Sequence, residues 1–190
     1  MVRYLLILNL CAVLSASVAA HAWSTAVAAQ YEKFNSGDVA FDYPDNWRLI
    51  ALPAPVVAGI TRGNELSFTI SRTSVEYPQT FNEAFAQYET ETIRKQYPDA
   101  TDFTSGTVKH KTLGEILQVD LIRPKGGQPG RGGRPLRLRL YSIPAGRSVY
   151  RVICLSRADE FARRHEPVFN RMVETLVITP PATGNPVNVP

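Results

Sequence analysis

The stretch LQVDLIRPKGGQPGRGGRPLRLRL, residues 117–140, holds two runs in which apolar and polar side chains alternate. Alternation of this kind is typical of β-strands with one buried face. If Arg123 faces Arg134 across a hairpin, apolar residues oppose apolar residues along both runs, whereas a shift by one residue would set leucines against polar side chains. The stretch therefore predicts two antiparallel strands, with the arginines of the second strand on the solvent side. The expected pairs are Leu121–Leu136, Asp120–Arg137, Val119–Leu138, Gln118–Arg139 and Leu117–Leu140.

The centre of this stretch, residues 124–133, is predicted to be a loop that is longer than a hairpin requires. Its glycines and arginines resemble an RNA-binding tail or a phosphate-binding loop. It contains no aromatic residue on which a base could stack, and it lacks the Gly-Lys-Ser/Thr sequence that binds phosphate and magnesium. We therefore expect a flexible basic loop and no nucleic-acid partner.

The loop and its flanking strands concentrate positive charge. One interpretation is that these side chains keep the hairpin soluble. The alternative is a surface for an acidic protein, an anionic glycan or a lipid headgroup, extended by arginines 147, 151 and 157 if the neighbouring strand pairs with the hairpin. The candidate partner-binding residues are Arg123, Lys125, Arg131, Arg134, Arg137 and Arg139.

The N-terminus has the three parts of a secretory signal peptide: Arg3, an apolar run over residues 4–18, and the small residues around His21. Cleavage is expected after Ala22, or as late as residue 28. The apolar run is short for a membrane span, which needs about 20 residues, although an uncleaved anchor is the alternative. We expect an exported protein, periplasmic in a Gram-negative source, that is not an integral membrane protein after cleavage.

Composition divides the rest of the chain into one predicted domain, residues 31–178, and a proline-rich, uncharged tail, residues 179–190. A tail of this composition is expected to be disordered. Signal cleavage would leave Cys154 as the single cysteine, so no internal disulfide is expected. The net charge of +4 suits a weak attraction to anionic surfaces.

Apolar periodicity predicts a run of strands interrupted by one long helix and followed by another. The first helix would begin at a Thr80–Glu83 capping box and bury a stripe that includes Phe85, Tyr88 and Ile93. The predicted fold class is α+β: an α-β-α sandwich with a central antiparallel sheet of about six to eight strands and two main helices. The main strands are expected over residues 39–41, 47–52, 56–62, 66–71, 102–111, 114–123, 135–143 and 149–155, and the last helix from 159, broken near 167.

Two stretches resemble the Mog1/PsbP-like superfamily, which includes exported bacterial DcrB-like (DUF1795) proteins. They are FDYPDNW, residues 41–47, and VYRVICLSRADEFARRHEPVFNRMVETLVI, residues 149–178. The first pairs an aromatic-proline turn with a following tryptophan, and the second is a strand, a short helical turn, a proline-led helix and an apolar pair. The resemblance implies an α-β-α sandwich and a protein that binds other proteins, with no shared catalytic motif to transfer.

The residues that most often carry chemistry are few. His110 is expected to face solvent beside a turn, and His165 to be a half-buried packing residue. Cys154 is expected in the core, with a reactive thiol as the alternative. The sequence contains no zinc-binding or nucleotide-binding motif, and a metal site would need carboxylates from unrelated segments. We therefore expect no metal and no cofactor. The acidic residues Asp42, Asp45, Glu65 and Asp120 are expected to be solvated.

These patterns favour an exported, non-enzymatic binding or accessory protein of the cell envelope, which docks a protein partner through its sheet and basic hairpin loop. The alternative is a carrier of a lipophilic or anionic small molecule. Its pocket would lie between a helix and the sheet, lined by Trp47, Phe68, Phe85 and Tyr88. An enzyme is disfavoured because the sequence offers no nucleophile–base pair or metal constellation.

Overall fold

The computed structural model describes residues 30–124 and 133–180. The predicted signal peptide and residues 181–190 lie outside these ranges. So do two of the candidate partner-binding residues, Lys125 and Arg131.

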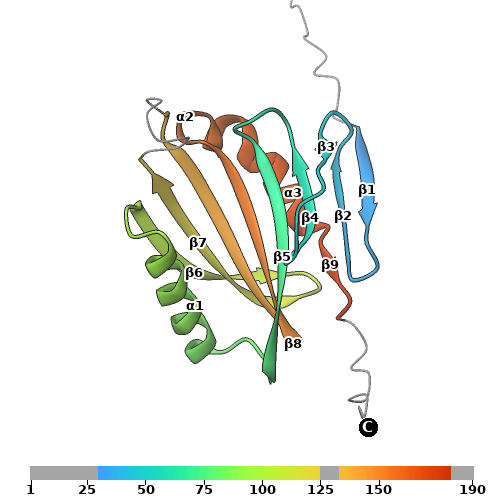
Figure 1. The fold of residues 1–190 in the computed structure, drawn as a ribbon, viewed down its shortest axis with the longest axis vertical. Coiled ribbons are helices and arrows are strands. Elements are labelled where there is room, and N and C mark those ends of the chain that lie inside the picture. The colour runs from blue at the N-terminus through green and yellow to red at the C-terminus, as the bar shows by residue number, and fades with distance from the viewer. Residues whose placement is uncertain (1–29, 125–132, 181–190) are drawn as a thin grey trace, which may run out of the picture.

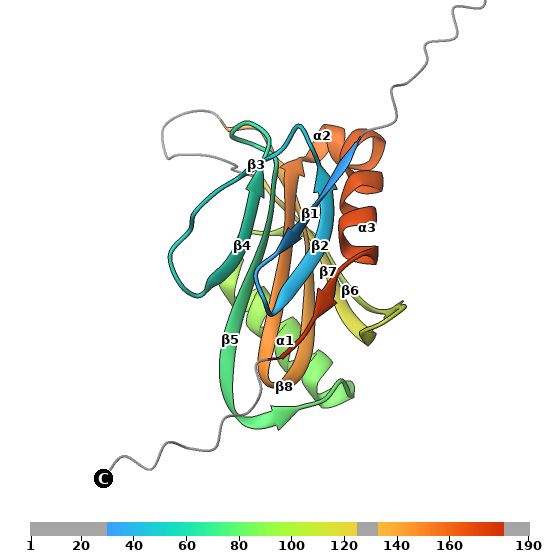
Figure 2. The ribbon, with the colours of Figure 1, turned by 90° about the vertical axis from the view of Figure 1, so that its right-hand side faces the viewer.

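A large antiparallel sheet of six strands forms the centre of the molecule (Figure 1). Residues 136–142 of β8 pair with β7 and residues 146–155 pair with β5, and Figures 1 and 2 show β8 doubling back so that its two arms lie side by side. These arms correspond to the two strands predicted over residues 135–143 and 149–155. In sheet order the strands are β3 (Arg48–Leu49), β4 (Val56–Thr61), β5 (Ser67–Gln79), β8 (Leu136–Arg157), β7 (Gly114–Arg123) and β6 (Thr101–His110).

Both faces of the large sheet are covered (Figure 2). Helix α1 (Glu83–Gln96) lies on one face. The other carries a continuous helical segment and a small sheet in the order β1-β2-β9. The fold is therefore α+β with helices on both sides of an antiparallel sheet, as the sequence predicts. The helical segment consists of α2 (Ala158–Glu160), the π-helix η1 (Phe161–His165) and α3 (Glu166–Glu174), and the small sheet of β1 (Tyr31–Asn35), β2 (Val39–Pro44) and β9 (Val177–Ile178).

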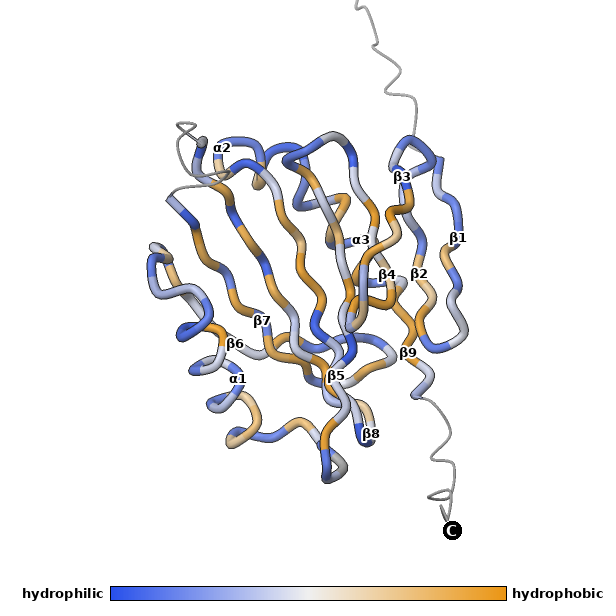
Figure 3. Tube along the Cα trace, in the orientation of Figure 1, coloured by the Kyte–Doolittle hydropathy of each residue, from blue (hydrophilic) through white to orange (hydrophobic). Residues whose placement is uncertain are grey.

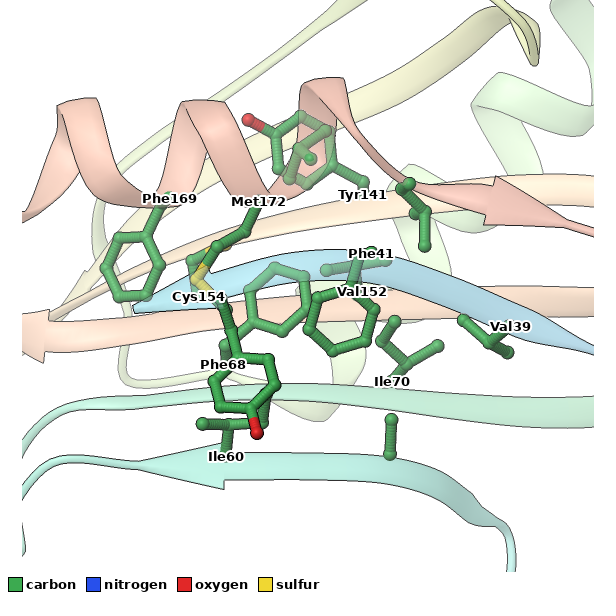
Figure 4. Close-up of a cluster of buried hydrophobic side chains, with 14 of the residues drawn as sticks. Val39, Phe41, Ile60, Phe68, Ile70, Tyr141, Val152, Cys154, Phe169 and Met172 are labelled. Carbon is green, nitrogen blue, oxygen red and sulfur yellow. The ribbon is translucent and has the colours of Figure 1, made fainter. Parts of the chain in front are cut away.

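The larger core lies between the sheet, α3 and β2 (Figure 4). Phe41 of β2 packs on Phe68 of β5, with ring centroids 5.0 Å apart, and Phe161 packs on Phe169 at 5.7 Å. All four rings are essentially inaccessible to solvent. Burying an apolar side chain of this size stabilises a fold by roughly 1.5–3 kcal/mol. This core therefore fixes α3 and the small sheet on the same face of the large sheet.

The second core lies beneath α1, where Ile93 packs with leucines of β7 and β8 and with one valine of β7. Because side chains of a strand alternate between faces, these residues alternate with the ones that point toward α3, and the hydropathy along β7 and β8 alternates in Figure 3. The sheet residues of this core are Leu117, Val119, Leu121, Leu138 and Leu140.

The predicted apolar stripe of α1 is wrong at Tyr88 and at Ala84, which are both exposed. Tyr88 is 67% exposed, whereas its neighbour Glu89 is 4% exposed. The Glu89 carboxylate is held by two donors from β8, because Ser142 Oγ and Arg151 Nη2 each lie 2.8 Å from Glu89 Oε2. A buried carboxylate is tolerated when it is paired and hydrogen-bonded, which explains why a charged residue replaces an aromatic one there.

The predicted helix start also differs. Asn82 is the N-cap, and its Oδ1 accepts a hydrogen bond from the backbone N–H of Phe85 at 2.8 Å. Asparagine is as effective an N-cap as threonine or better, and Asn82 lies two residues after the predicted cap at Thr80. The helix begins at the later one.

The predicted hairpin is present, but its register is shifted by two residues. Asp120 opposes Arg139 rather than Arg137, and Leu121 opposes Leu138. A shift of two residues keeps every side chain on its predicted face, so apolar pairing alone does not distinguish the two registers. The connection between β7 and β8 is accordingly residues 124–135, two longer than predicted.

The expectation that Arg137 and Arg139 lie on the solvent side of the sheet is wrong for Arg139, whose side chain is 11% exposed. Arg139 Nε lies 3.0 Å from Asp120 Oδ1, and its Nη1 lies 2.7 Å from Glu166 Oε1 at the start of α3. Asp120 is therefore buried as well, not solvated as predicted. Two carboxylates neutralise the guanidinium, and the ring of Phe161 lies 5.2 Å beneath it.

The pKa of Arg139 reflects this balance. Burial alone would lower it, but the hydrogen bond to Glu166 and the charge of Asp120 outweigh burial and raise it. The arginine therefore stays charged inside the fold, and its ion pairs connect β7, β8 and α3.

Replacing Arg139 with methionine should destabilise the protein by about 3–5 kcal/mol, because the substitution leaves Asp120 as a buried charge whose main partner is gone. Urea denaturation followed by circular dichroism measures this change. The matched control is Arg163→Met on the exposed side of η1, which should change the free energy of unfolding by less than about 0.5 kcal/mol.

The double variant Asp120→Asn/Arg139→Met should lose less stability than the sum of the two single variants, because the two side chains interact directly. A loss below about 1 kcal/mol for Arg139→Met would contradict the assigned role of this ion pair.

Candidate functional site

A cleft of about 580 Å³ is lined in part by residues 157–168. It therefore lies at the end of the molecule where β8 leads into α2, an end that can be found by the label α2 in Figure 1. We call it the end cleft. Its volume falls within the range of known ligand sites, roughly 300–1,000 Å³. Three segments that are distant in the sequence line it: residue 47, residues 62–66 and residues 157–168. The lining residues are Trp47, Arg62, Asn64, Glu65, Leu66, Arg157, Glu160, Arg164, His165 and Val168.

One wall of the end cleft is the turn that connects β4 and β5. Gly63 adopts a positive φ of 71°, a conformation that favours glycine. The hydroxyl of Thr61 donates to the carbonyl oxygens of Gly63 and Leu66, at 2.7 and 2.9 Å. These bonds hold the turn in a defined shape and leave Arg62 exposed on the wall.

The opposite segment contains the π-helix η1. The backbone N–H of Glu166 bonds to the carbonyl of Phe161, five residues earlier, and Pro167 follows in the first turn of α3. Proline lacks an N–H and its ring disfavours a regular α-helical turn before it. The wider turn keeps Phe161 in the core while Arg164 and His165 line the end cleft. Turns of this type occur frequently at functional sites.

Glu160 is the acidic centre of this wall. Its carboxylate lies within 4 Å of three basic side chains: Arg157 at 3.6 Å, Arg164 at 3.8 Å and His165 at 3.3 Å. Arg157 is also bound by Asp159, with Nη2 2.7 Å from Oδ2. That hydrogen bond lowers the pKa of Asp159 and raises the pKa of Arg157. The lining residues include three arginines and two glutamates, and Asp159 beside the cleft neutralises one of these arginines, Arg157.

The floor of the end cleft is apolar. Trp47 is 5% exposed and Leu66 is 7% exposed, with half-buried Val168 beside them. The ring of Trp47 meets Phe169 edge-on at 5.8 Å, which ties the floor to the larger core. The arrangement combines an apolar base with a charged rim, and it suits a ligand that has both kinds of group.

The structure separates the predicted basic residues. Arg123 points toward α1, with its guanidinium 5.8 Å from the ring of Tyr97. Arg137 lies 5.4 Å from the ring of Phe161 on the opposite face, and Arg139 is buried next to it. These arginines do not share one surface.

Arg134 is exposed close to the end cleft. Its charge contributes to the lowered pKa of Asp159, and the carbonyl of the following Pro135 accepts a hydrogen bond from the N–H of Ala158 at 2.9 Å. The returning end of the loop therefore adjoins the start of α2. The outgoing strand end at Arg123 points its side chain the other way, toward α1.

The pocket predicted for a small-molecule carrier is not formed by its predicted residues. Trp47 and Phe68 belong to the core beneath α3, whereas Phe85 lies on α1, on the other face of the sheet. Tyr88 is exposed to solvent. The four side chains therefore do not converge.

The prediction for His110 is also wrong, because this residue is 7% exposed. Its Nε2–H donates to the carbonyl of Val173 at 2.7 Å, and its Nδ1 accepts from the N–H groups of Thr112 and Leu113, both at 3.2 Å. The ring links the β6–β7 turn to the end of α3. The sequence showed a polar Lys-His-Lys run and gave no sign of this tertiary contact.

Cys154 lies in the core, as predicted. It is 0% exposed, and Figure 4 shows it within the apolar cluster that contains Phe68, Phe169 and Met172. Burial raises the pKa of its thiol. A reactive cysteine requires an accessible thiolate, so the structure favours a packing role.

Within residues 30–124 and 133–180, no group of His, Cys, Asp and Glu side chains is arranged to hold a metal ion. None of the helices in these ranges is long and apolar enough to cross a membrane.

Solved structures show where this fold occurs elsewhere. The chain is similar to cyanobacterial PsbP (CyanoP) from Synechocystis sp. PCC 6803, with a TM-score of 0.54 and 8% identity over 80% of this chain and 94% of that one. A weaker similarity, with a TM-score of 0.48, 15% identity and coverage of 80% and 91%, is to LpqN, a protein involved in cell envelope biogenesis of Mycobacterium tuberculosis. No protein-family model and no curated protein matches the sequence. The fold is therefore PsbP-like, and at these identities the similarity extends to the fold alone.

We expect Cys154 to react with a thiol reagent at least ~100-fold more slowly in the folded protein than in denaturant, because the reagent reaches it only when the core opens. A Cys11→Ser background leaves Cys154 as the single thiol, and the release of the reagent's chromophore measures the rate. Rapid stoichiometric labelling of the native protein would show that the core packing described here is wrong.

Proposed function

We propose that this protein is an exported, non-enzymatic accessory protein of the cell envelope that docks a protein partner at the end cleft and the adjoining basic loop. Export is supported by the signal-peptide pattern of residues 1–22, which would leave a domain of residues 31–178 and a tail of residues 179–190. The proposal assigns the chain to the DcrB-like branch of the Mog1/PsbP-like superfamily, on the strength of the order of its elements and its PsbP-like fold.

The observation that carries the proposal is the composition of the end cleft. An open concave surface with an apolar floor and a charged rim resembles the anatomy of protein interfaces, which have an apolar centre and a polar surround. The end of the loop that contains Arg134 adjoins this surface through the bond between Pro135 and Ala158. A basic loop beside a cleft adds electrostatic attraction and raises the rate of association with an acidic partner.

The chemistry of the lining residues supports a binding role over catalysis. None of the residues that line the end cleft carries a nucleophilic hydroxyl, thiol or amine. The ring nitrogens of His110 are occupied by backbone groups, and Cys154 is buried. His165 and Glu160 form an acid–base pair in the end cleft, and no hydroxyl, thiol or amine from the lining residues accompanies it.

A photo-cross-linking amino acid at Asn64, on the rim of the end cleft, should capture one specific envelope protein in the native organism. The same amino acid at Tyr88, which is exposed as well but lies on the α1 face, is the control and should not capture it. Mass spectrometry identifies the adduct. Failure of Asn64 to capture a protein, or equal capture at both positions, would refute docking at the end cleft.

Replacing Lys125, Arg131 and Arg134 with serine should weaken partner binding and leave folding intact, because the loss of three positive charges reduces the attraction to an acidic partner. The cross-linked yield at Asn64 and the melting temperature measure the two effects. An unchanged yield would limit the loop to a role in solubility.

A further inference from the structure

The cations of the end cleft differ in how fully carboxylates neutralise them. Arg157 is saturated: it donates to both oxygens of Asp159, at 3.2 and 2.7 Å, and lies 3.6 Å from Glu160. Arg164 has Glu160 at 3.8 Å, and 71% of its side chain is exposed. Arg62 is exposed and has no ion-pair partner within the described ranges. Two guanidinium groups are thus available to an incoming ligand.

These two arginines belong to separate walls. Arg62 follows the last residue of β4, where the backbone N–H of Arg62 bonds to the carbonyl of Leu66 at 3.0 Å. Arg164 lies in η1. A guanidinium group binds a carboxylate through two parallel hydrogen bonds, and it is less strongly hydrated than an ammonium group. Two arginines from different walls therefore suit acidic groups that enter the space between these segments.

The apolar floor of the end cleft argues against a flat ligand such as a membrane surface. The apolar atoms belong to Trp47 and Leu66, which are 5% and 7% exposed at the base of the cleft. A membrane surface would meet the charged rim and leave this base uncovered. An extended peptide places successive side chains at different depths, so one apolar side chain can reach the floor while its acidic neighbours remain at the rim.

We propose that the end cleft binds an acidic segment of the partner protein, with aspartate or glutamate carboxylates on Arg62 and Arg164 and an adjacent apolar side chain on Trp47, Leu66 and Val168. This inference rests on the proposed docking of a protein partner and adds the chemistry of the segment that is recognised.

The test uses the whole chain with Trp23→Phe, which leaves Trp47 as the single tryptophan and makes its fluorescence report on the floor of the cleft. The probe is a short acetylated peptide with phenylalanine between aspartate and glutamate residues. Two comparison peptides keep the phenylalanine. A neutral one has asparagine and glutamine in place of the acidic residues, and a basic one has lysine. We expect the acidic peptide to change the emission of Trp47 and to bind at least ~10-fold more tightly than the neutral one.

Arg62→Ser/Arg164→Ser should lower the affinity for the acidic peptide by an order of magnitude or more, which is roughly the effect of losing two charge-assisted contacts. The matched control, Lys33→Ser/Lys95→Ser, removes the same charge from exposed positions on β1 and α1 and should leave affinity within about twofold. Arg62→Glu/Arg164→Glu should bind the basic peptide in place of the acidic one.

The inference is overturned if the acidic and neutral peptides bind equally, or if Arg62→Ser/Arg164→Ser binds like the unmodified chain. It is also overturned if phosphatidylglycerol vesicles, and not the peptide, bind in a manner that depends on these arginines.

Cross-linking distinguishes failure of the acidic-segment inference from failure of the proposed function. A partner captured at Asn64 with equal yield in Arg62→Ser/Arg164→Ser would sustain docking and reject an acidic segment. Peptide binding with no captured envelope protein would count against the proposed function alone.

Discussion

The buried guanidinium of Arg139 determines how the helical segment sits on the sheet. It joins Asp120 of β7 to Glu166, the first residue of α3, and it lies above the ring of Phe161 in η1. Taking an arginine out of water costs several kcal/mol, and the cost is offset only when its partners hold the right geometry. The start of α3 is therefore fixed relative to β7 and β8.

The position of α3 also determines the position of one wall of the end cleft. Arg164 and His165 precede Glu166 directly in η1, so the ion pair that holds Glu166 also limits where these side chains can lie. On the other side, the shape of the β4–β5 turn is fixed by the hydrogen bonds of Thr61. The two walls are thus held by independent polar contacts, while the packing of Trp47 on Phe169 connects the floor to the larger core.

The sequence predicted the fold where a periodic pattern spans several residues. Alternation along β7 and β8 identified the strands and the face of each side chain, because that period is a property of the extended backbone. It could not identify the register, since a shift of two residues preserves the pattern. Sequence patterns also failed to predict the burial of Glu89 and His110. Contacts from β8 and α3 make burial of these polar side chains favourable. Such contacts depend on tertiary structure and leave no local periodicity.

The end cleft was not predicted for a similar reason. Its walls come from segments roughly one hundred residues apart, and the residues of each wall read locally as an ordinary turn or an ordinary charged helix. A signal was present in the run Arg163-Arg164-His165 before Pro167, where basic residues coincide with a helix irregularity. The positive charge of the loop and its flanking strands is contiguous in sequence, whereas the charged residues of the end cleft come together only in space.

The two-residue ambiguity between β7 and β8 bears on the order of events during folding. Both registers set leucines and valines against one another, and the native register also sets Leu117 against Ser142, so apolar pairing alone does not select it. The native register gains its advantage when Arg139 sits opposite Asp120 and also meets Glu166, which belongs to the last helix of the domain. The native register of β7 and β8 therefore depends on α3, a helix that is synthesised some thirty residues after Arg139.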